Sequence, residues 1–360
     1  MNSPEKMQTP PAKTVAGLQA PLVTVVIVSF NYAEYVERCL RSVEEQDYPN
    51  IQCIVVDCAS TDNTLAVIEQ AQARKPFFQI LRLDSNRGHL LNALSALNEV
   101  KGVFVTFLDS DDFIFPEFVS THVRAHLNDL NSAAVSVTDQ IQVDAAGQVL
   151  AGTCHWHQKW RAFEAGTAWA ELTRSGNSAI DSLLAVDGAR NFRLHYIPAW
   201  WSSWLMERWI WSATSALMFR RSVVEYLAPL SDQSADLKDF AFDSYFARIA
   251  HSVGGTLVVE GVQGAYRRHG RNVYSPNPPL GGQTPNGSVD EFASFSIAQR
   301  AARNVLIAKN RDLKRLLGKD LYYSVAWQLM SNDDFQAFVS GYDEDKIIWE
   351  KVIASASPKL

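Results

Sequence analysis

The stretch Gly102-Val-Phe-Val-Thr-Phe-Leu108, followed at once by Asp109-Ser-Asp-Asp112, decides the fold class of this chain of 360 residues. An unbroken apolar run rich in β-branched and aromatic residues is typical of a strand that is covered on both faces of a parallel sheet. In open α/β sheets, ligands bind just beyond the carboxyl ends of such strands. Three carboxylates at that position indicate a ligand site, and an Asp-rich turn with helix-capping roles is the structural alternative.

The spacing of these carboxylates favours a metal ion. Asp109 and Asp111 are two residues apart, so their side chains point the same way if the chain stays extended. Paired carboxylates suit a hard cation, and Mg2+ or Mn2+ is commonly held by one or two carboxylates together with the phosphates of a nucleotide substrate. Asp112 can then turn elsewhere, to hold the loop or to cap a helix near Pro116.

Outward from this stretch, strands alternate with helices. Apolar runs predict strands at residues 22–28, 51–56 and 77–83, and apolar residues at helical spacing predict a helix after each strand. We expect the run from Ser60 to Thr64 to supply the N-terminal cap of the second helix. This alternation predicts an α/β fold whose mixed, mostly parallel sheet has right-handed crossovers and is flanked by helices.

Polar residues follow several of the predicted strands. Ser29 and Asn31 follow the first strand, Asp57 follows the second and Asp109 follows the fourth. Each has a structural alternative, because Ser, Asn and Asp are common in turns and at helix caps. Since the carboxyl ends of parallel strands meet at one edge of a sheet, their joint placement predicts a ligand site at that rim.

Composition narrows the class of protein. With 47% hydrophobic residues, 20% charged residues and a net charge of -6, the chain is predicted to be soluble and globular. It does not have the basic charge that is typical of nucleic-acid-binding proteins. Its four cysteines form no CxxC pair, which predicts neither a zinc site nor a disulfide framework. We expect Cys53 and Cys58 to be small core residues. A cytoplasmic location follows, with peripheral contact at the inner face of a membrane left open.

Three motifs resemble a known family. The segments VTVVIVSFNYAEYVERCLRSVEEQDYPNIQCIVVDCASTDNT, NRGHLLNAL and FVTFLDSDD are similar to the nucleotide-binding half of family 2 glycosyltransferases, which have the GT-A fold, a Rossmann-like α/β architecture. The resemblance covers roughly residues 21–125. It implies a nucleoside-diphosphate-sugar donor with UDP favoured, an inverting transfer, and a divalent metal held by the DxD motif at Asp109-Ser-Asp111.

The resemblance also implies individual roles. Asp57 corresponds to the residue that hydrogen-bonds the base, Asp109 faces the ribose, and Asp111 ligates the metal. Ser29 and Asn31 lie on the first nucleotide loop, and the Arg87-Gly88 segment resembles the loop that closes over the nucleotide. The family often has a second acidic residue and a glycine after the position of Asp57, whereas this chain has Cys58 and Ala59. The donor-site residues predicted in this way are Ser29, Asn31, Asp57, Arg87, Gly88, Asp109, Ser110, Arg267 and Arg268.

The second half of the chain is expected to shape the acceptor site. The segment from Trp211 resembles the family's small residues and strand beneath the acceptor, which makes Trp211, Thr214 and Ser215 acceptor-side candidates, with strand-to-helix packing as the alternative. Transfer needs a base that removes the proton of the acceptor hydroxyl. We predict Asp243 in that role, with Asp239 as the second candidate because it lies one helical turn away. A carboxylate that only stabilises a helix N-terminus is the alternative.

A basic motif follows at Tyr266-Arg-Arg-His-Gly-Arg-Asn-Val273, which is similar to the YRxH ending of the same family's catalytic domain. Arginines suit diphosphates because of their bidentate fork, so Arg267 and Arg268 are predicted to grip the donor. We expect His269 to complete the metal shell with Asp111 and Asp109. The alternative for this motif is a basic surface turn.

Five of the ten tryptophans fall within twelve residues, at Trp200, Trp201, Trp204, Trp209 and Trp211. Their rings suit stacking on acceptor sugars or contact with a membrane interface near a lipid-linked acceptor, and packing against the tail is the structural alternative.

The predicted organisation has five parts. Residues 1–20 form a disordered tail, residues 21–125 the nucleotide-sugar half and residues 126–275 the acceptor half. A Pro/Gly-rich linker or lid at 276–290 precedes a helical extension at 291–360, which we expect to dock on the catalytic domain or to form an oligomer contact.

The sequence thus predicts a metal-dependent inverting glycosyltransferase acting on a hydroxyl of a glycan, lipid-linked or protein-attached acceptor. A sugar nucleotidyltransferase is one alternative, although the segment VSFNYAEY lacks a Gly-rich phosphate loop. A non-catalytic glycan-binding protein on the same fold is the other.

Overall fold

The computed structural model describes residues 18–154, 170–174, 192–199, 209–230, 237–238, 240–272 and 291–355. The predicted N-terminal tail and the predicted linker at 276–290 fall wholly or almost wholly outside this part of the chain. Asp239 and the tryptophans at 200, 201 and 204 lie outside it as well.

A single mixed sheet organises the described residues, in the strand order β3-β2-β1-β4-β10-β6-β11-β9-β8. Strand β1 pairs in parallel with β2 and with β4, β2 pairs in parallel with β3, and β11 pairs in parallel with β6. The shorter strand β10 enters antiparallel between β4 and β6. The strands are β1 Val23–Ser29, β2 Ile51–Asp57, β3 Phe78–Arg82, β4 Phe104–Asp109, β5 Phe113–Ile114, β6 Val135–Asp144, β7 Val149–Ala151, β8 Ala170–Arg174, β9 Phe192–Ile197, β10 Leu217–Arg220 and β11 Thr256–Arg268.

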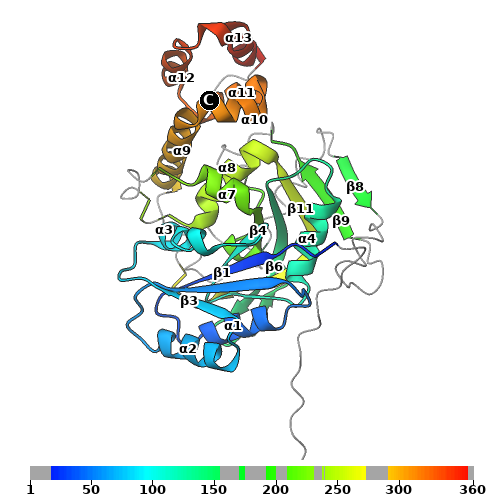
Figure 1. Cartoon of the computed structure of the whole chain (residues 1–360), viewed down its shortest axis with the longest axis vertical. Helices are drawn as coiled ribbons and strands as arrows, with labels where there is room; N and C mark the ends of the chain where they lie inside the picture. Colours follow the sequence, from blue (N-terminus) through cyan, green and yellow to red (C-terminus); the bar gives the residue numbers. More distant parts are fainter. Residues whose placement is uncertain are drawn as a thin grey trace, which may run out of the picture.

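Helices cover both faces of the sheet, with α1 and α2 on one side and α3, α7 and α8 on the other (Figure 1). The α/β fold class predicted from the sequence, with a mostly parallel sheet flanked by helices, is confirmed. The helices are α1 Val36–Glu44, α2 Thr64–Arg74, α3 His89–Leu94, α4 Phe118–Asn128, α7 Arg221–Leu227, α8 Phe242–Gly254, α9 Glu291–Ala308, α10 Asn310–Leu317, α11 Lys319–Leu329, α12 Asn332–Val339 and α13 Lys346–Ser355.

Alternation along β1 explains the two apolar layers. Val25 and Ile27 join the buried cluster beneath α1, α2 and α4, whereas Val26 and Val28 join the cluster that contains α3 and α8. Successive side chains of a strand point to opposite faces, so every residue of the run is buried, including the polar Thr24, whose hydroxyl donates to Gln52 Oε1 at 2.8 Å. This is why the central strands can be recognised as continuous apolar runs.

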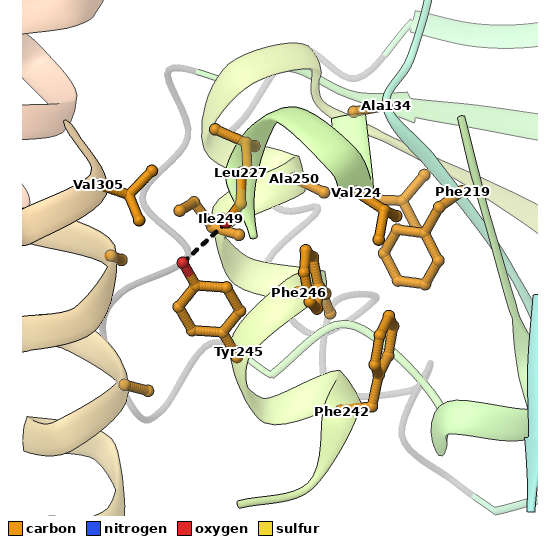
Figure 2. Packing of buried hydrophobic residues seen from close by; sticks show 14 of the residues in the cluster. Ala134, Phe219, Val224, Leu227, Phe242, Tyr245, Phe246, Ile249, Ala250 and Val305 are labelled. Carbon is orange, nitrogen blue, oxygen red and sulfur yellow. Dashed lines mark hydrogen bonds between the residues drawn. The ribbon is translucent and has the colours of Figure 1, made fainter. Parts of the chain in front are cut away.

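The second layer is built around α8. Phe242 stacks on Phe246 with ring centroids 4.5 Å apart, and Phe219 of β10 meets Phe242 edge to face. Figure 2 shows these rings beside Tyr245, whose hydroxyl donates to the carbonyl of Leu227 at 2.9 Å. The first turn of α8 is therefore anchored by aromatic packing, which fixes where its polar residues emerge.

The C-terminal helices α9 to α13 extend this layer away from the sheet (Figure 1). Their internal packing includes a buried carboxylate, Asp345, which accepts from Lys314 Nζ at 2.8 Å, Lys319 Nζ at 2.5 Å and the hydroxyl of Tyr323 at 2.6 Å. Although burial opposes it, these three donors lower the pKa of Asp345. None of the helices in the described residues combines the length and hydropathy that crossing a bilayer requires.

Candidate functional site

Three parallel strands deliver polar residues to one rim of the sheet. In the strand register Ser29 lies opposite Asp57, and Asp109 lies opposite Val28 on the other side of β1. The prediction that Ser29, Asp57 and Asp109 meet at one edge is therefore confirmed. The apolar strands place these residues, because each run ends where the chain leaves the covered sheet.

Asn31 ties the first rim loop to the second. Its backbone N–H donates to Ser60 Oγ at 3.1 Å, and its side-chain oxygen accepts from the backbone N–H of Thr61 at 2.8 Å. Asn31 has φ +56°, a left-handed conformation that asparagine tolerates better than most residues. Asn31 thus holds the loop after β1 against the loop after β2.

Asp62, which precedes the N-cap residue Asn63, accepts from the first residue of the second helix. Its Oδ1 accepts from the backbone N–H of Thr64 at 2.9 Å, and its Oδ2 accepts from Ala33 N–H at 3.2 Å. The predicted cap run is correct as a segment, but the hydroxyl of Ser60 serves the neighbouring loop instead. The two loops therefore form one hydrogen-bonded unit.

Three buried polar atoms at this rim have no hydrogen-bond partner: Ser29 Oγ, Asp57 Oδ1 and Ser110 Oγ. Leaving a buried polar group unsatisfied costs about 1–3 kcal/mol, and such groups are rare in folded proteins. Their clustering at the carboxyl ends of β1, β2 and β4 marks a place where a ligand with complementary donors and acceptors would relieve that cost.

Cys58 and Ala59, the two departures from the family pattern, lie in different environments. Cys58 is fully buried in the core, and burial raises the pKa of its thiol to about 12. The prediction that Cys53 and Cys58 are core residues is confirmed. Ala59 has φ +60°, a conformation that favours glycine.

The turn at Asp109–Asp112, the acidic turn, contacts the basic motif that begins at Tyr266 through His269. Its Nε2 lies 2.8 Å from Asp111 Oδ2, while its Nδ1 accepts from the backbone N–H of Arg271 at 3.1 Å. The ring stacks on Tyr35, with centroids 5.0 Å apart and planes at 21°, and its side chain is fully buried. The structure therefore brings together two of the three predicted metal ligands, Asp111 and His269.

The third predicted ligand, Asp109, is paired with a different histidine. Its Oδ1 lies 2.6 Å from His89 Nε2, and His89 Nδ1 accepts from the backbone N–H of Phe242 at 3.1 Å. Burial lowers the pKa of His89, but the carboxylate of Asp109 outweighs it and the net shift is upward. The N–H of Phe242 opposes ring protonation, because an imidazolium has no acceptor nitrogen.

Asp112 is the most enclosed carboxylate of the turn. Its Oδ1 accepts from the backbone N–H of Arg267 at 2.9 Å. Burial raises the pKa of Asp112 well above its usual range, and the neighbouring Asp111 and Asp109 raise it further. Asp112 thus holds the turn against β11, the loop-holding role proposed from the sequence.

Arg267 does not present its guanidinium to a donor. Its Nε donates to the carbonyl of Asp111 at 2.8 Å, and its Nη1 donates to the carbonyls of Asp144 at 3.3 Å and Ala145 at 2.9 Å. The prediction that Arg267 grips a diphosphate is corrected, because main-chain carbonyls occupy its donors. Arg267 instead fixes the backbone of the acidic turn.

Arg268 also points away from the rim. It is buried, and its Nη1 donates to Gln142 Oε1 on β6 at 3.4 Å, which favours a structural role for Arg268 over the predicted contact with a diphosphate. Arg271 is the exposed cation of the motif: it pairs with Glu34, and its guanidinium lies 5.3 Å from the ring centroid of Tyr32. Sequence reasoning quoted Arg271 in its motif but did not select it.

The segment at Gly88 packs against the chain leading to α8. A Cβ on Gly88 would lie 1.4 Å from the carbonyl oxygen of Lys238, and Gly88 has φ +89°. Arg87 is exposed beside it and donates its backbone N–H to Asn92 Oδ1 at 3.0 Å. The predicted loop is therefore present, and only glycine fits at its closest approach.

Asp243 lies in the first turn of α8, next to the residue that His89 contacts. Its Oδ1 accepts from the backbone N–H of Ser244 at 2.7 Å. Burial raises the pKa of Asp243 to about 6, with Asp109 adding to the rise and His89 opposing it. A carboxylate whose pKa is raised toward neutral pH is suited to act as a general base.

The acceptor-side candidates are buried in this structure. Ser215 Oγ accepts from the backbone N–H of Asp109 at 3.1 Å, and Thr214 is buried beside it. Trp211 is fully buried and donates from Nε1 to Thr256 Oγ1 at 3.1 Å. These placements favour the packing alternative for Trp211, and they make Ser215 a support of the acidic turn.

His89 is the site residue that sequence reasoning missed. It opens α3 immediately after Gly88 within the motif NRGHLLNAL. The only signal in the sequence was its place beside a predicted nucleotide loop, because its carboxylate partner Asp109 is 20 residues away.

The described residues alone do not form a complete metal site. Among the described residues, no group of three or more His, Cys, Asp or Glu side chains gathers closely enough to hold an ion. Asp111 and His269 do converge, and a carboxylate oxygen with an imidazole nitrogen is a suitable partial donor set when the cation displaces the proton that His269 Nε2 donates to Asp111. This arrangement fits a divalent cation whose remaining ligands are substrate phosphates and water.

Comparison with known proteins shows which family this region is similar to. Residues 24–171 match the family model described as Glycosyl transferase family 2. This stretch contains the rim loops and the acidic turn. The match and relatives named as glycosyltransferases support the family resemblance drawn from the motifs.

Among the relatives, hyaluronan synthase of Pasteurella multocida is 29% identical over 182 residues, which are 51% of this chain and 17% of that protein. The putative teichuronic acid biosynthesis glycosyltransferase TuaG of Bacillus subtilis (strain 168) is 36% identical over 92 residues, 26% of this chain and 36% of TuaG. The chain thus covers well under half the length of either relative. Among solved structures, S. aureus TarS 1-349 in complex with UDP-GlcNAc matches 92% of this chain and 79% of that chain, with 15% identity and a TM-score of 0.48.

Proposed function

We propose that this protein is a glycosyltransferase that moves a sugar from a nucleoside-diphosphate-sugar, with UDP favoured, to a hydroxyl of a glycan, lipid-linked or protein-attached acceptor. The observation that carries the proposal is the rim where Ser29, Asp57 and Asp109 end three neighbouring parallel strands beside the Asp111–His269 pair. The family match over residues 24–171 supports it independently.

The donor's nucleoside is proposed to occupy the rim over β1 and β2. The unsatisfied carboxylate oxygen of Asp57 is suited to accept from an N–H of a base, and the unsatisfied hydroxyls of Ser29 and Ser110 are suited to ribose or phosphate oxygens. The Arg87-Gly88 loop borders this region. Arg271 replaces Arg267 and Arg268 as the proposed cation for the diphosphate, because it is exposed beside Tyr32.

Asp111 and His269 are the residues that would hold Mn2+ or Mg2+, with Asp109 beside them. When bound, the cation supplies charge neutralisation for the departing diphosphate. The protein's own contribution is to hold the acidic turn in place, through Arg267 on the carbonyl of Asp111 and Ser215 on the N–H of Asp109. Preorganised groups of this kind lose little energy to rearrangement during reaction.

Asp243 is the proposed general base. Its position in the first turn of α8 and its pKa of about 6 suit removal of a proton from an acceptor hydroxyl near neutral pH. Direct attack of that hydroxyl on the sugar inverts the anomeric centre and needs no protein nucleophile. Asp239 stays the second candidate, outside the described residues.

The test is a donor screen with purified protein, Mn2+ and a panel of glycan acceptors, which follows the nucleoside diphosphate released from UDP-glucose, UDP-N-acetylglucosamine, GDP-mannose and dTDP-glucose. We expect release from one donor by the wild type and loss of release in Asp243→Asn. Sugar binding without any release would favour the non-catalytic alternative. Pyrophosphate formed from a nucleoside triphosphate and a sugar phosphate would favour the nucleotidyltransferase.

A further inference from the structure

His89 uses both ring nitrogens, and each reaches a different half of the proposed site. Nε2 lies 2.6 Å from Oδ1 of Asp109 at the end of β4. Nδ1 lies 3.1 Å from the backbone nitrogen of Phe242, the first residue of α8. The ring therefore spans from the acidic turn to the helix that carries Asp243.

These contacts define one tautomer. A backbone N–H can only donate, so Nδ1 must be the acceptor and the proton of the neutral ring must lie on Nε2. That proton then points at a carboxylate, which makes the contact with Asp109 a charge-assisted hydrogen bond. Asp109 is about a quarter exposed, at 27% of its side chain, so the bond restricts a carboxylate that would otherwise have rotational freedom.

Two further contacts join the same segments. The backbone N–H of Leu90 donates to the carbonyl of Phe240 at 3.0 Å, and Gly88 approaches the carbonyl of Lys238 more closely than any side chain would allow. Residues 88–90 and the chain entering α8 are thus held together at three successive positions. His89 is the member of this set whose side chain also reaches the acidic turn.

We propose that His89 is a positioning residue that couples donor binding to the general base: its Nε2–H orients the carboxylate of Asp109, and its Nδ1 anchors the start of α8 next to Asp243. The inference rests on the proposed function, since Asp109 is assigned to the donor and Asp243 to the acceptor. His89 itself touches neither substrate in this scheme. It acts through the two groups that do.

Two substitutions separate the two bonds. In His89→Asn, the amide oxygen lies near the position of Nδ1 and keeps an acceptor for Phe242, but no donor reaches Asp109. In His89→Gln, the longer amide places its N–H₂ near Nε2 and keeps the donor to Asp109, but the acceptor for Phe242 is lost. Both variants remove the ring, so they share any cost that comes from packing alone.

The measurements are UDP affinity by calorimetry in Mn2+ and the kinetics of the donor found in the screen. A hydrogen bond to a charged group corresponds to a change of about 10- to 100-fold. We therefore expect His89→Asn to weaken UDP binding about 10- to 100-fold with the smaller effect on kcat. For His89→Gln we expect near-normal UDP affinity and a reduced kcat.

A matched control exists at His195, whose Nε2 lies 2.9 Å from Glu260 Oε1 on β11, away from the acidic turn. His195→Asn and His195→Gln also break up a histidine–carboxylate pair, and we expect them to alter neither UDP affinity nor kcat. A merely structural role for His89 would lower the melting temperature of both His89 variants and change affinity and kcat in parallel. That result, or two His89 variants with wild-type values, would overturn the proposal.

The tautomer gives a test that does not depend on activity. Long-range proton–nitrogen NMR spectra of the wild type, with the His89 signals assigned by their loss in His89→Gln, report which ring nitrogen carries the proton. A protonated Nε2 with a bare Nδ1 supports the proposal, and a proton on Nδ1 overturns it. A wild type that binds none of the nucleotides would contradict the proposed function, and the tautomer would still decide the geometry of His89.

Discussion

His269 Nε2 lies 2.8 Å from Asp111 Oδ2, although the two residues are 158 positions apart in the chain. The contact joins the end of β4 to the end of β11, and it closes the proposed donor site from both halves of the sheet. His89 repeats the arrangement with Asp109. Each carboxylate of the DxD motif therefore faces its own histidine, and each histidine is oriented by a backbone N–H on Nδ1.

The first prediction concerns the pH dependence of transfer. A base must be deprotonated to act, and burial raises the pKa of Asp243 to about 6, whereas an ordinary aspartate titrates near 3.9. We expect kcat/KM to fall as the pH drops through about 6 and to reach a plateau above it. The profile should be measured with the donor from the screen. An acid limb centred near pH 4 would contradict the assignment of Asp243.

Replacing Ala59 by glycine should stabilise the folded protein. Its φ of +60° is costly for a residue with a Cβ, by about 1–2 kcal/mol, and the greater freedom of glycine in the unfolded chain offsets part of that gain. We expect Ala59→Gly to raise the free energy of unfolding by about 0.5–1 kcal/mol in urea titrations.

Ala66 provides the matched control for this change. It is an exposed residue in the first turn of α2, where replacing alanine by glycine costs up to about 1 kcal/mol. Ala66→Gly should therefore shift the urea midpoint in the opposite direction. A loss of stability in both variants would show that Ala59 is not strained.

Gly88 should tolerate no side chain. The Cβ of Gly88→Ala would lie 1.4 Å from the carbonyl oxygen of Lys238, so the loop or the chain entering α8 must move. Gly88 also has φ +89° and ψ +159°, a backbone conformation that is essentially restricted to glycine. We expect a lower melting temperature and weaker UDP binding in this variant. Gly152→Ala, which has nothing within 4 Å of its Cβ, should match the wild type in both measurements.

Two buried histidines on α4 should make the fold sensitive to acid. Burial lowers the pKa of His126 to about 3, and Arg220 lowers it further; burial also lowers the pKa of His122 well below its usual range. Below about pH 6.5 the unfolded chain binds protons at these residues and the folded chain does not. Folding stability should therefore fall as the pH drops from about 6.5 toward the folded-state values, by about 1.4 kcal/mol per pH unit for each histidine.

His126→Phe isolates one of these contributions. The ring stacks on Phe104 with centroids 4.8 Å apart, and Nδ1 has no hydrogen-bond partner, so phenylalanine should fit without losing a strong polar contact. Urea unfolding at pH 6.5 and pH 5 should show a pH dependence smaller by about 2 kcal/mol in the variant. An unchanged pH dependence would contradict the assignment.

The sequence predicted the rim well because its strands are continuous apolar runs. Their ends at Ser29, Asp57 and Asp109 follow directly from burial on both faces of the sheet. The helix predicted after the third strand ends at Leu94, and a short 3-10 turn covers Leu97–Glu99. Periodicity identifies such an element but not its last turn.

The partners of the site's charged groups were harder to predict. Arg267 looked like a phosphate ligand because the sequence does not show that main-chain carbonyls would take its donors. His89 was overlooked because its two partners, Asp109 and Phe242, become neighbours only after the sheet and α8 are assembled. The local sequence pattern predicts which residues lie at the ends of the buried strands. The packing of distant segments decides which of their hydrogen-bond donors remain available to a ligand.

The most direct test of the central claim is calorimetric titration of UDP, dTDP and GDP, each with Mn2+ and with a chelator, into the wild type and into Asp111→Asn. This substitution keeps the shape of the side chain and removes the charge beside His269. The account predicts that one nucleotide binds in Mn2+ only, and that Asp111→Asn loses this binding. Binding that is equally strong with the chelator or in the variant, or no binding of any nucleotide, would contradict a metal-dependent donor site at Asp111 and His269.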